Sequence, residues 1–153
     1  MYTLDIYGEV WKDYTHEFEE LQKHFTEFIK YKRSVKYDES VETLKNYFAL
    51  VFPTLINTEG IPGTIIDAYA AGLPVISSKW ESYDDVIEDN ITGIGYKFGS
   101  DDALVETLEM IKSNPQKIID MKEACLRKAK DFSPKVIVSG FIRKFFKGVS
   151  YDF

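Results

Sequence analysis

Cysteine, histidine and long apolar segments are all scarce in this chain of 153 residues. The single cysteine, Cys125, excludes an internal disulfide, and its place on a predicted helix indicates a core position. His16 and His24 have no metal-ligating partners at a useful spacing, so we expect no protein-held metal. No stretch is long and apolar enough to span a bilayer, and no signal peptide is expected.

Basic residues are fewer than acidic ones, 19 against 25, which gives a formal net charge of −6. This balance argues against a general nucleic-acid-binding protein, which would carry a basic surface. Hydrophobic residues make up 44% of the chain and charged residues 29%, as in ordinary globular proteins. The length suits one domain with its own hydrophobic core.

Two apolar runs, residues 49–53 and 74–77, are typical of buried strands, and a helical segment separates them. Gly72 followed by Pro74 ends that helix, the glycine as a left-handed cap and the proline as a stop. Strand, helix and strand in this order form a βαβ unit with a parallel sheet. The loop at residues 59–63 therefore lies at the carboxyl edge of the sheet, where ligands bind in open α/β folds.

The helix between these strands is predicted to begin near Pro62–Thr64, since proline is tolerated in a first helical turn. Gly60 and Gly63 let the backbone approach a ligand closely and permit positive φ angles. The N–H groups of residues 63–66 are expected to be free and, with the helix dipole, to form an anion site suited to phosphate. The alternative is that the two glycines serve only a tight turn.

Two carboxylates accompany this helix start: Glu59 lies before it and Asp67 lies one turn inside it. Both are expected to face the same cleft and to accept hydrogen bonds from sugar or ribose hydroxyls, as acidic residues do in dinucleotide folds. Two other interpretations stay open. Thr64 and Asp67 also fit a capping box, in which Asp67 only satisfies a backbone N–H, and Glu59 fits a solvated loop residue.

Periodicity over the rest of the chain predicts further alternating strands and helices. We therefore expect a single α/β domain over residues 1–153, with a Rossmann-like doubly wound parallel sheet and helices on both faces. Residues 77–80 close a predicted strand and are expected to border the cleft. The expected strands span residues 3–7, 27–31, 49–53, 75–78 and 94–98, and the expected helices span residues 13–24, 38–46, 63–71, 84–87, 101–113, 115–130 and 134–147.

The segment E-G-x-P-G-T-x-x-D-A-x-x-x-G-x-P-V-I, residues 59–76, resembles the nucleotide-sugar-binding signature of retaining glycosyltransferases of family 4, which have the GT-B fold. In that family two acids are separated by seven residues, as Glu59 and Asp67 are here, but the second is usually glutamate. Flanking segments resemble the same family, and the likeness extends over roughly residues 3–147. These flanking segments are Leu4–Glu9, Ile29–Val35 and Asp85–Gly93.

The resemblance implies the role of each site residue. Glu59 would be the catalytic residue that contacts the transferred sugar, and Asp67 would bind the ribose hydroxyls. Backbone N–H groups of residues 61–64, with the Thr64 hydroxyl, would hold the diphosphate. The implied donor-binding set is Gly8, Ser34, Val35, Gly60, Ile61, Pro62, Gly63, Thr64 and Asp67, with no metal ligand.

The resemblance also implies the molecular context. The ligand would be a UDP- or GDP-sugar, with no tightly bound cofactor. The chain matches only the donor-binding half of a two-domain enzyme, so an N-terminal acceptor domain, the first strand of this domain and a basic loop are expected to be missing. The full enzyme would transfer a sugar, with retention, to a cell-surface polysaccharide or glycolipid. It would act in the cytoplasm, with peripheral contact at the inner face of the membrane.

Two alternatives to this function stay open. The same two-domain fold serves epimerases and phosphorylases, although these need acid–base groups or a cofactor lysine that the sequence does not show. The other alternative is a non-catalytic module that kept the fold for nucleotide binding or assembly.

Three further features carry expectations. Arg33 and Asn90 stand where the family usually has glycine. Asparagine tolerates the left-handed conformation, so the turn at Asn90 is expected to survive, whereas Arg33 puts a backbone contact to the base in doubt. Ile137, Phe141 and Phe145 form a stripe at helical spacing that favours packing in the core, with a membrane-surface helix as the alternative.

Overall fold

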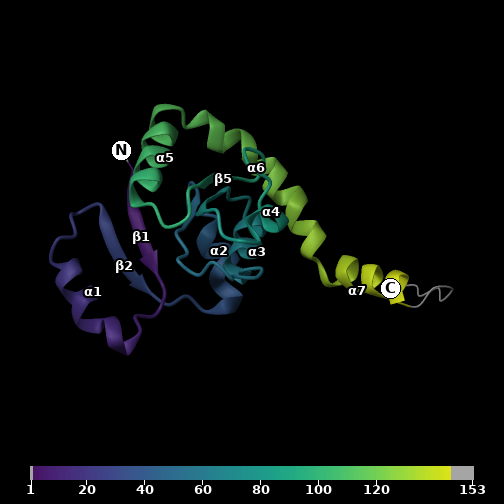
Figure 1. The fold of residues 1–153 in the computed structure, drawn as a ribbon, viewed down its shortest axis with the longest axis horizontal. Helices are drawn as coiled ribbons and strands as arrows, with labels where there is room; N and C mark the ends of the chain where they lie inside the picture. Colours follow the sequence, from purple (N-terminus) through teal and green to yellow (C-terminus); the bar gives the residue numbers. More distant parts are fainter. Residues whose placement is uncertain (1, 146–153) are drawn as a thin grey trace. The chain divides into compact units, whose positions relative to one another are not determined.

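The computed structural model describes residues 2–145 and divides the chain into two compact units, Met1–Ser40 and Val41–Phe153 (Figure 1). The division falls inside the short helix α2 (Ser40–Leu44), which follows the 3-10 turn η2 (Tyr37–Glu39). Each unit is built around its own parallel sheet, so the α/β class predicted from the sequence is confirmed.

The first unit is one strand–helix–strand element. β1 (Leu4–Tyr7) and β2 (Ile29–Arg33) pair in parallel, and the chain between them forms the 3-10 turn η1 (Lys12–Tyr14) and α1 (Thr15–Gln22). β2 begins two residues later than predicted, because the N–H of Ile29 still donates to the carbonyl of Thr26 in a turn at 3.1 Å. None of the described residues 2–40 is buried.

The second unit contains a sheet of three parallel strands in the order β3 (Leu50–Phe52), β4 (Val75–Ser78) and β5 (Gly93–Tyr96). α3 (Gly63–Ala70) joins β3 to β4, so the predicted βαβ unit is confirmed. The short helix α4 (Tyr83–Val86) lies between β4 and β5 in the sequence. After β5 come α5 (Asp101–Ser113), α6 (Gln116–Ala129), the 3-10 turn η3 (Lys130–Phe132) and α7 (Pro134–Phe145).

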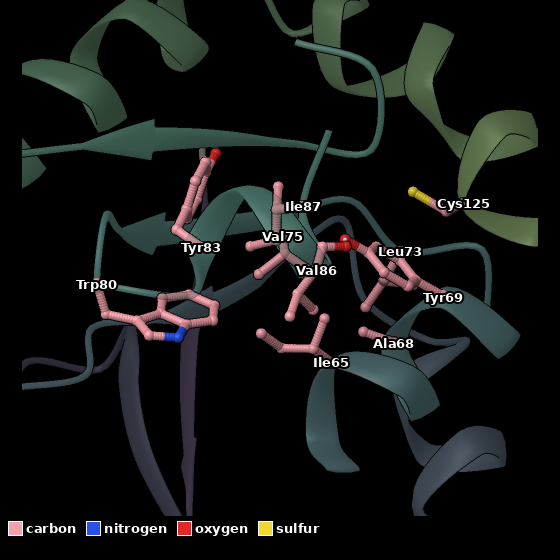
Figure 2. Close-up of a cluster of buried hydrophobic side chains, with 10 residues drawn as sticks. All are labelled: Ile65, Ala68, Tyr69, Leu73, Val75, Trp80, Tyr83, Val86, Ile87 and Cys125. Atoms are coloured by element: carbon pink, nitrogen blue, oxygen red, sulfur yellow. The ribbon is translucent and has the colours of Figure 1, made fainter. Parts of the chain in front are cut away.

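Alternate residues of β4 enter two different cores, because side chains along a strand point to opposite faces. Val75 belongs to the cluster drawn in Figure 2, together with residues of α3 and α4. Ile76 belongs to a second cluster with Ile111 of α5. α6 contributes to both, since its first half supplies Met121 to the second cluster and its second half supplies Cys125 to the first. Helices therefore cover both faces of the sheet, as predicted.

The end of α3 is fixed by a left-handed glycine. Gly72 has φ +72°, its N–H donates to the carbonyl of Tyr69, and the next N–H, of Leu73, donates to that of Ala68 at 2.8 Å. This pair of bonds is the Schellman motif, which satisfies carbonyls at a helix end. The predicted left-handed cap is confirmed, and it turns the chain directly into β4.

Asp89 ties the loop after α4 to β5, to Tyr83 of α4 and to Lys79, the residue that follows β4. Its carboxylate accepts hydrogen bonds from the ammonium of Lys79 at 2.9 Å, the hydroxyl of Tyr83 at 3.0 Å and the backbone N–H of Gly95 at 2.9 Å. Burial by itself would raise the pKa of Asp89, but these three donors outweigh it and hold the pKa below its usual range. The neighbouring Asn90 has φ +62°, so its predicted left-handed turn is confirmed.

The predicted core packing of the α7 stripe is wrong for the described residues. Ile137 and Phe141 are each 56% exposed and Phe145 is 61% exposed. In Figure 1, α7 continues beyond α6, away from the sheet of its own unit, which is why its apolar side chains find little to pack on. The predicted helix end at residue 147 lies outside the described residues.

Replacement of Gly72 by alanine is expected to lower the free energy of unfolding by about 1–2 kcal/mol, because an L-residue is strained at this φ. The new Cβ would also lie 3.3 Å from the Cγ of Leu126. Gly63→Ala is the matched control: a Cβ there meets nothing within 4 Å, and alanine favours a helix. Urea unfolding of both variants measures the difference, and equal stability of the two would contradict this account of the cap.

Asp89→Asn is expected to destabilise the chain by about 1–2 kcal/mol at pH 7, since hydrogen bonds to charged groups contribute on this order. Because the folded pKa of Asp89 is depressed, its stabilisation is complete above the unfolded pKa of about 3.9 and is lost as the pH falls through the folded value. Denaturant titrations at pH 7, 5 and 3 should show the difference between wild type and variant shrinking at acid pH. Asp85→Asn, an exposed position on α4, is the control and should change little.

Candidate functional site

The loop between β3 and α3 is attached to the sheet by two buried serines of β4. The Ser77 hydroxyl donates to the carbonyl of Phe52, and the Ser78 hydroxyl donates to that of Thr54, both at 2.7 Å. Both serines were expected to border the cleft, but their burial makes them anchors of the loop instead. Further along, the N–H of Glu81 donates to the carbonyl of Asn57 at 3.1 Å. The loop is therefore held at several points before it reaches the helix.

The first turn of α3 is left open at its N-terminus. Pro62 is the N-cap residue, with an extended ψ of 125°. Among the described residues, no side chain makes a capping hydrogen bond at this helix start. The capping-box interpretation of Thr64 and Asp67 is therefore wrong, because Thr64 lies inside the helix and does not precede it. Of the N–H groups predicted to be free, that of Ile65 donates to the carbonyl of Pro62 at 3.0 Å. The N–H groups of Gly63 and Thr64 lack the i−4 partner that later helical residues have.

The two loop glycines face open space. Neither Gly60 nor Gly63 has a positive φ, and a Cβ built on either would meet nothing within 4 Å. The positive φ that glycine permits is thus used at neither position, and the alternative that a tight turn requires these glycines is not supported by the geometry. Gly60, Ile61, Gly63 and Thr64 are exposed, whereas Pro62 is buried and fixes the backbone. What the glycines leave is an unobstructed approach to the helix N-terminus.

The two carboxylates lie on either side of this N-terminus in the sequence and are both half-buried. Glu59 stands at the end of a turn in which its N–H donates to the carbonyl of Ile56 at 3.2 Å. Asp67 lies four residues after Gly63, so the two residues fall on the same face of α3. The second unit thus brings together an open helix N-terminus, the Thr64 hydroxyl and two acidic side chains on one stretch of nine residues, 59–67.

The other predicted donor-binding residues, Gly8, Ser34 and Val35, belong to the first unit. Gly8 has φ +133°, which favours glycine, and its N–H donates to the carbonyl of Arg33 at 3.1 Å while its carbonyl accepts from the Tyr31 hydroxyl at 2.8 Å. The fold itself thus accounts for a glycine at this position, and a role of Gly8 in donor binding stays a prediction. Ser34 is exposed, and its hydroxyl lies 3.5 Å from a carboxylate oxygen of Glu9.

Arg33 adopts φ +62°, the left-handed conformation that glycine takes more readily. The backbone at the end of β2 therefore makes the turn that a glycine would allow, with an arginine in its place. The arginine carries the strain of this conformation, and the backbone contact of Ser34 and Val35 to the base stays a prediction.

A shallow open hollow of about 460 Å³ lies in the first unit, between the end of β1 and helix α1. Its walls are aromatic and apolar, with Trp11, Tyr14 and Tyr31 among them, and its two charged residues are Glu9 and Glu17. With two carboxylates and no basic side chain in its lining, the hollow is poorly suited to a diphosphate.

The segment Asp85–Gly93 contacts α3 through a network of hydrogen bonds. The Tyr69 hydroxyl of α3 lies 3.1 Å from the Thr92 hydroxyl, which accepts a bond from the N–H of Glu88 at 3.0 Å. The Cys125 thiol donates to the carbonyl of Thr92 at 3.4 Å, and burial raises the pKa of this thiol to about 12. Burial likewise raises the pKa of Tyr69. Cys125 is thus an inert core residue, as predicted, and this network of uncharged groups could not be predicted from the sequence.

Two kinds of feature are absent from residues 2–145. No group of three or more His, Cys, Asp and Glu side chains in that range is arranged to hold a metal ion. Within the same residues, no helix has both the length and the apolar character needed to cross a membrane.

The fold resembles those of several solved glycosyltransferases. HepE from Anabaena, in complex with UDP and glucose, superposes with a TM-score of 0.78 at 14% identity, over 96% of this chain and 41% of HepE. TarM from S. aureus, solved with UDP, gives 0.75 at 18% identity over 95% of this chain and 29% of TarM. The lipopolysaccharide outer core galactosyltransferase WaaB gives 0.73 at 19%, over 96% of this chain and 41% of WaaB. The chain thus spans less than half the length of these enzymes.

Of the two sequence comparisons, the one with curated proteins finds no match. The one with family models is consistent with the likeness of the folds. The model of the family described as glycosyl transferases group 1 matches residues 2–132, which is most of the sequence and includes the whole segment 59–67. The protein therefore belongs to the glycosyl transferases group 1 family, and its fold matches the C-terminal domain of a GT-B glycosyltransferase.

Proposed function

We propose that this chain is the donor-binding domain of a glycosyltransferase and binds a nucleotide diphosphate-sugar at the N-terminus of α3. The observation that carries the proposal is the open helix start at Gly63, with no obstruction over Gly60 and Gly63 and with Glu59 and Asp67 beside it. A helix N-terminus attracts anions through its N–H groups and its dipole. Membership of the glycosyl transferases group 1 family makes a nucleotide-sugar the expected anion.

The diphosphate is assigned to the first turn of α3. The N–H groups of Gly63 and Thr64 donate to its oxygens, and the exposed Thr64 hydroxyl adds a further donor. These donors belong to α3, and the loop that leads to it is attached to the sheet through Ser77 and Ser78, so little reorganisation is needed when negative charge builds up on the departing diphosphate. Such preorganised donors stabilise a transition state more than the ground state.

The carboxylates are assigned to hydroxyl groups on either side of the diphosphate. Glu59 contacts the transferred sugar, and Asp67 accepts hydrogen bonds from the ribose. Aspartate is one methylene shorter than the glutamate usual in the family, so the ribose must lie correspondingly closer to α3. For Gly8, Ser34 and Val35 of the first unit, the role in donor binding that the family resemblance implies stays a prediction, with backbone groups of Ser34 and Val35 as the groups expected to hold the base. UDP is the nucleotide to test first, because HepE and TarM were solved with it.

The complete enzyme is proposed to have a second, N-terminal domain that supplies the acceptor site and the remaining donor-phosphate contacts. The structures of HepE and WaaB support this, since the chain covers only 41% of each. In that context the reaction is hexosyl transfer with retention to a cell-surface polysaccharide or glycolipid, at the cytoplasmic face of the membrane. The 153-residue chain alone is the donor-binding part of that machinery.

Titration of the chain with UDP, GDP and ADP by NMR is expected to shift the amide signals of residues 59–67. One of the three nucleotides is expected to cause larger shifts than the other two. Gly63→Ala should weaken binding at least about tenfold, because its Cβ obstructs the approach of the diphosphate, although it meets nothing in the chain and does not lower stability. Asp67→Ala should weaken UDP binding by about tenfold or more, the effect of one lost hydrogen bond to a charged group. Asp85→Asn serves as the control for loss of a carboxylate elsewhere.

Normal UDP affinity in Gly63→Ala would remove the α3 N-terminus from the site. Shifts confined to residues outside 59–67 would do the same. We also expect no sugar transfer by the chain alone, so measurable transfer from UDP-glucose to any acceptor would contradict the division of labour proposed here. UDP binding without transfer, once the chain is joined to an N-terminal domain, would favour the non-catalytic binding module.

A further inference from the structure

One buried hydrogen-bond donor of the second unit has no acceptor. Of the buried side-chain nitrogen and oxygen atoms in residues 2–145, only the indole Nε1 of Trp80 lacks a hydrogen-bond partner. Trp80 is 3% exposed, so its N–H is withdrawn from solvent as well. A buried donor without a partner carries its full desolvation penalty, and such groups are rare in folded proteins. The N–H of Trp80 is therefore a donor that a second state of the protein can use.

The remainder of Trp80 is held in place by its neighbours. Its ring meets Phe52 edge to face at a centroid distance of 6.1 Å, and Tyr83 at 5.6 Å. Its backbone N–H donates to the carbonyl of Ser78 at 3.2 Å, and its carbonyl accepts from the N–H of Tyr83 at 3.0 Å. In Figure 2 the indole nitrogen lies on the edge of the ring that is turned away from Tyr83. The unpaired N–H thus has a fixed direction.

Trp80 lies next to the loop between β3 and α3. Phe52, which its ring contacts, is the last residue of β3, so the loop begins directly after it. The N–H of Glu81, the residue that follows Trp80, donates to the carbonyl of Asn57 at 3.1 Å. Asn57 precedes Glu59 by two residues, which span at most about 7 Å of chain. One hydrogen bond and a short stretch of backbone therefore separate Trp80 from Glu59.

Glu59 is an acceptor that matches this donor. It is half-buried, and no hydrogen bond or ion pair of its carboxylate is found among residues 2–145. The loop carbonyls of Phe52, Thr54 and Asn57 already accept hydrogen bonds from the segment 77–81. A carboxylate also accepts a stronger bond from an N–H than a carbonyl does. A donor without an acceptor and an acceptor without a donor thus lie on two neighbouring segments.

The two groups can meet only if the loop moves. Nε1 of Trp80 is covered by atoms of this chain, so neither a ligand nor another domain contacts it while the surrounding segments keep their places. The bonds that attach the loop to the segment after β4 all come before Glu59, and Pro62 is buried. Residues 58–61 are therefore the least restrained part of the loop, and Glu59 is among them.

We propose that Trp80 is a positioning residue for Glu59. When a nucleotide diphosphate-sugar binds at the N-terminus of α3, residues 58–61 shift, and the Glu59 carboxylate accepts a hydrogen bond from the indole N–H of Trp80. This bond orients the carboxylate toward the transferred sugar, and it removes the penalty of the unpaired donor in the bound state only. The inference rests on the proposed function and adds to it the residue that holds Glu59 in place.

The indole signal of Trp80 reports the bond directly. Trp11 is the other tryptophan of the chain, so the variant Trp11→Phe has a single indole N–H signal in a nitrogen-15 NMR spectrum. We expect UDP-glucose, with which HepE was solved, to move this signal downfield as the hydrogen bond forms, and Glu59→Ala to abolish the movement. Amide shifts at residues 59–67 with a stationary indole signal would overturn the positioning role and leave the donor site intact. Absence of both would refute the donor site and this inference with it.

A second experiment removes the N–H and keeps the shape of the ring. Benzothienylalanine, in which sulfur replaces the indole N–H, is incorporated in place of Trp80 in the Trp11→Phe chain, which is also the reference. We expect at least about tenfold weaker binding of UDP-glucose and less than about threefold weaker binding of UDP, because Glu59 is assigned to the sugar. Combined with Glu59→Ala, the substitution should weaken UDP-glucose binding no further than Glu59→Ala alone. Equal weakening for both ligands would indicate a purely structural role and overturn the proposal.

The stability of the chain without nucleotide tests whether the N–H is unpaired in that state. An unpaired buried donor stabilises nothing, so benzothienylalanine at position 80 should leave the midpoint of urea unfolding unchanged or raise it. A lower midpoint would show that the N–H already has a partner, such as a buried water, and would overturn the proposal. Trp80→Phe is not a substitute for this experiment, because the smaller ring leaves a cavity that lowers stability by itself.

Discussion

The pairing of β4 with β3 is the constraint on which the position of the candidate site depends. Residues of β4 not only form the ladder with β3 but also send the Ser77 and Ser78 hydroxyls to the carbonyls that begin the loop. At the other end of α3, the Gly72 cap returns the chain to that same strand. The helix N-terminus is thus positioned from both ends by one strand, so its open N–H groups have a fixed direction. A loop without these anchors would have to order its donors each time an anion bound.

The parts of the fold that could be predicted from the sequence are those set by local chemistry. The βαβ unit follows from two apolar runs and a glycine–proline stop, and the turn at Asn90 follows from the tolerance of asparagine for positive φ. Both depend on a few consecutive residues and on no partner far away in the chain. The serine anchors and the carboxylate of Asp89 could not be predicted in this way, because their acceptors and donors come from other elements that only the folded chain brings near.

The failures have the same physical origin. The capping-box pattern of Thr64 and Asp67 does not by itself say where the helix begins. It requires Thr64 to be the N-cap, whereas Pro62 has that place and its extended backbone starts the helix earlier. The stripe on α7 shows that one face of the helix is apolar but not what covers that face. In a compact unit the default cover is the core, yet α7 extends past the sheet that would supply it. Periodicity therefore predicts a helix correctly and its packing partner incorrectly.

Glycines distinguish the demands of the fold from those of a ligand. A Cβ at Gly93 would lie 2.2 Å from the carbonyl oxygen of Val75, and Gly72 has a φ that strains any L-residue, so the fold itself requires both. Gly60 and Gly63 have ordinary φ values and empty space around them, and α3 would gain from alanine at its first position. A helix that forgoes this gain, at the point where its N–H groups are open, is consistent with space reserved for a group outside the polypeptide. Arg33 is a different case from Gly60 and Gly63. Its left-handed backbone is retained at a cost in strain, whereas at the two glycines a side chain would obstruct the site.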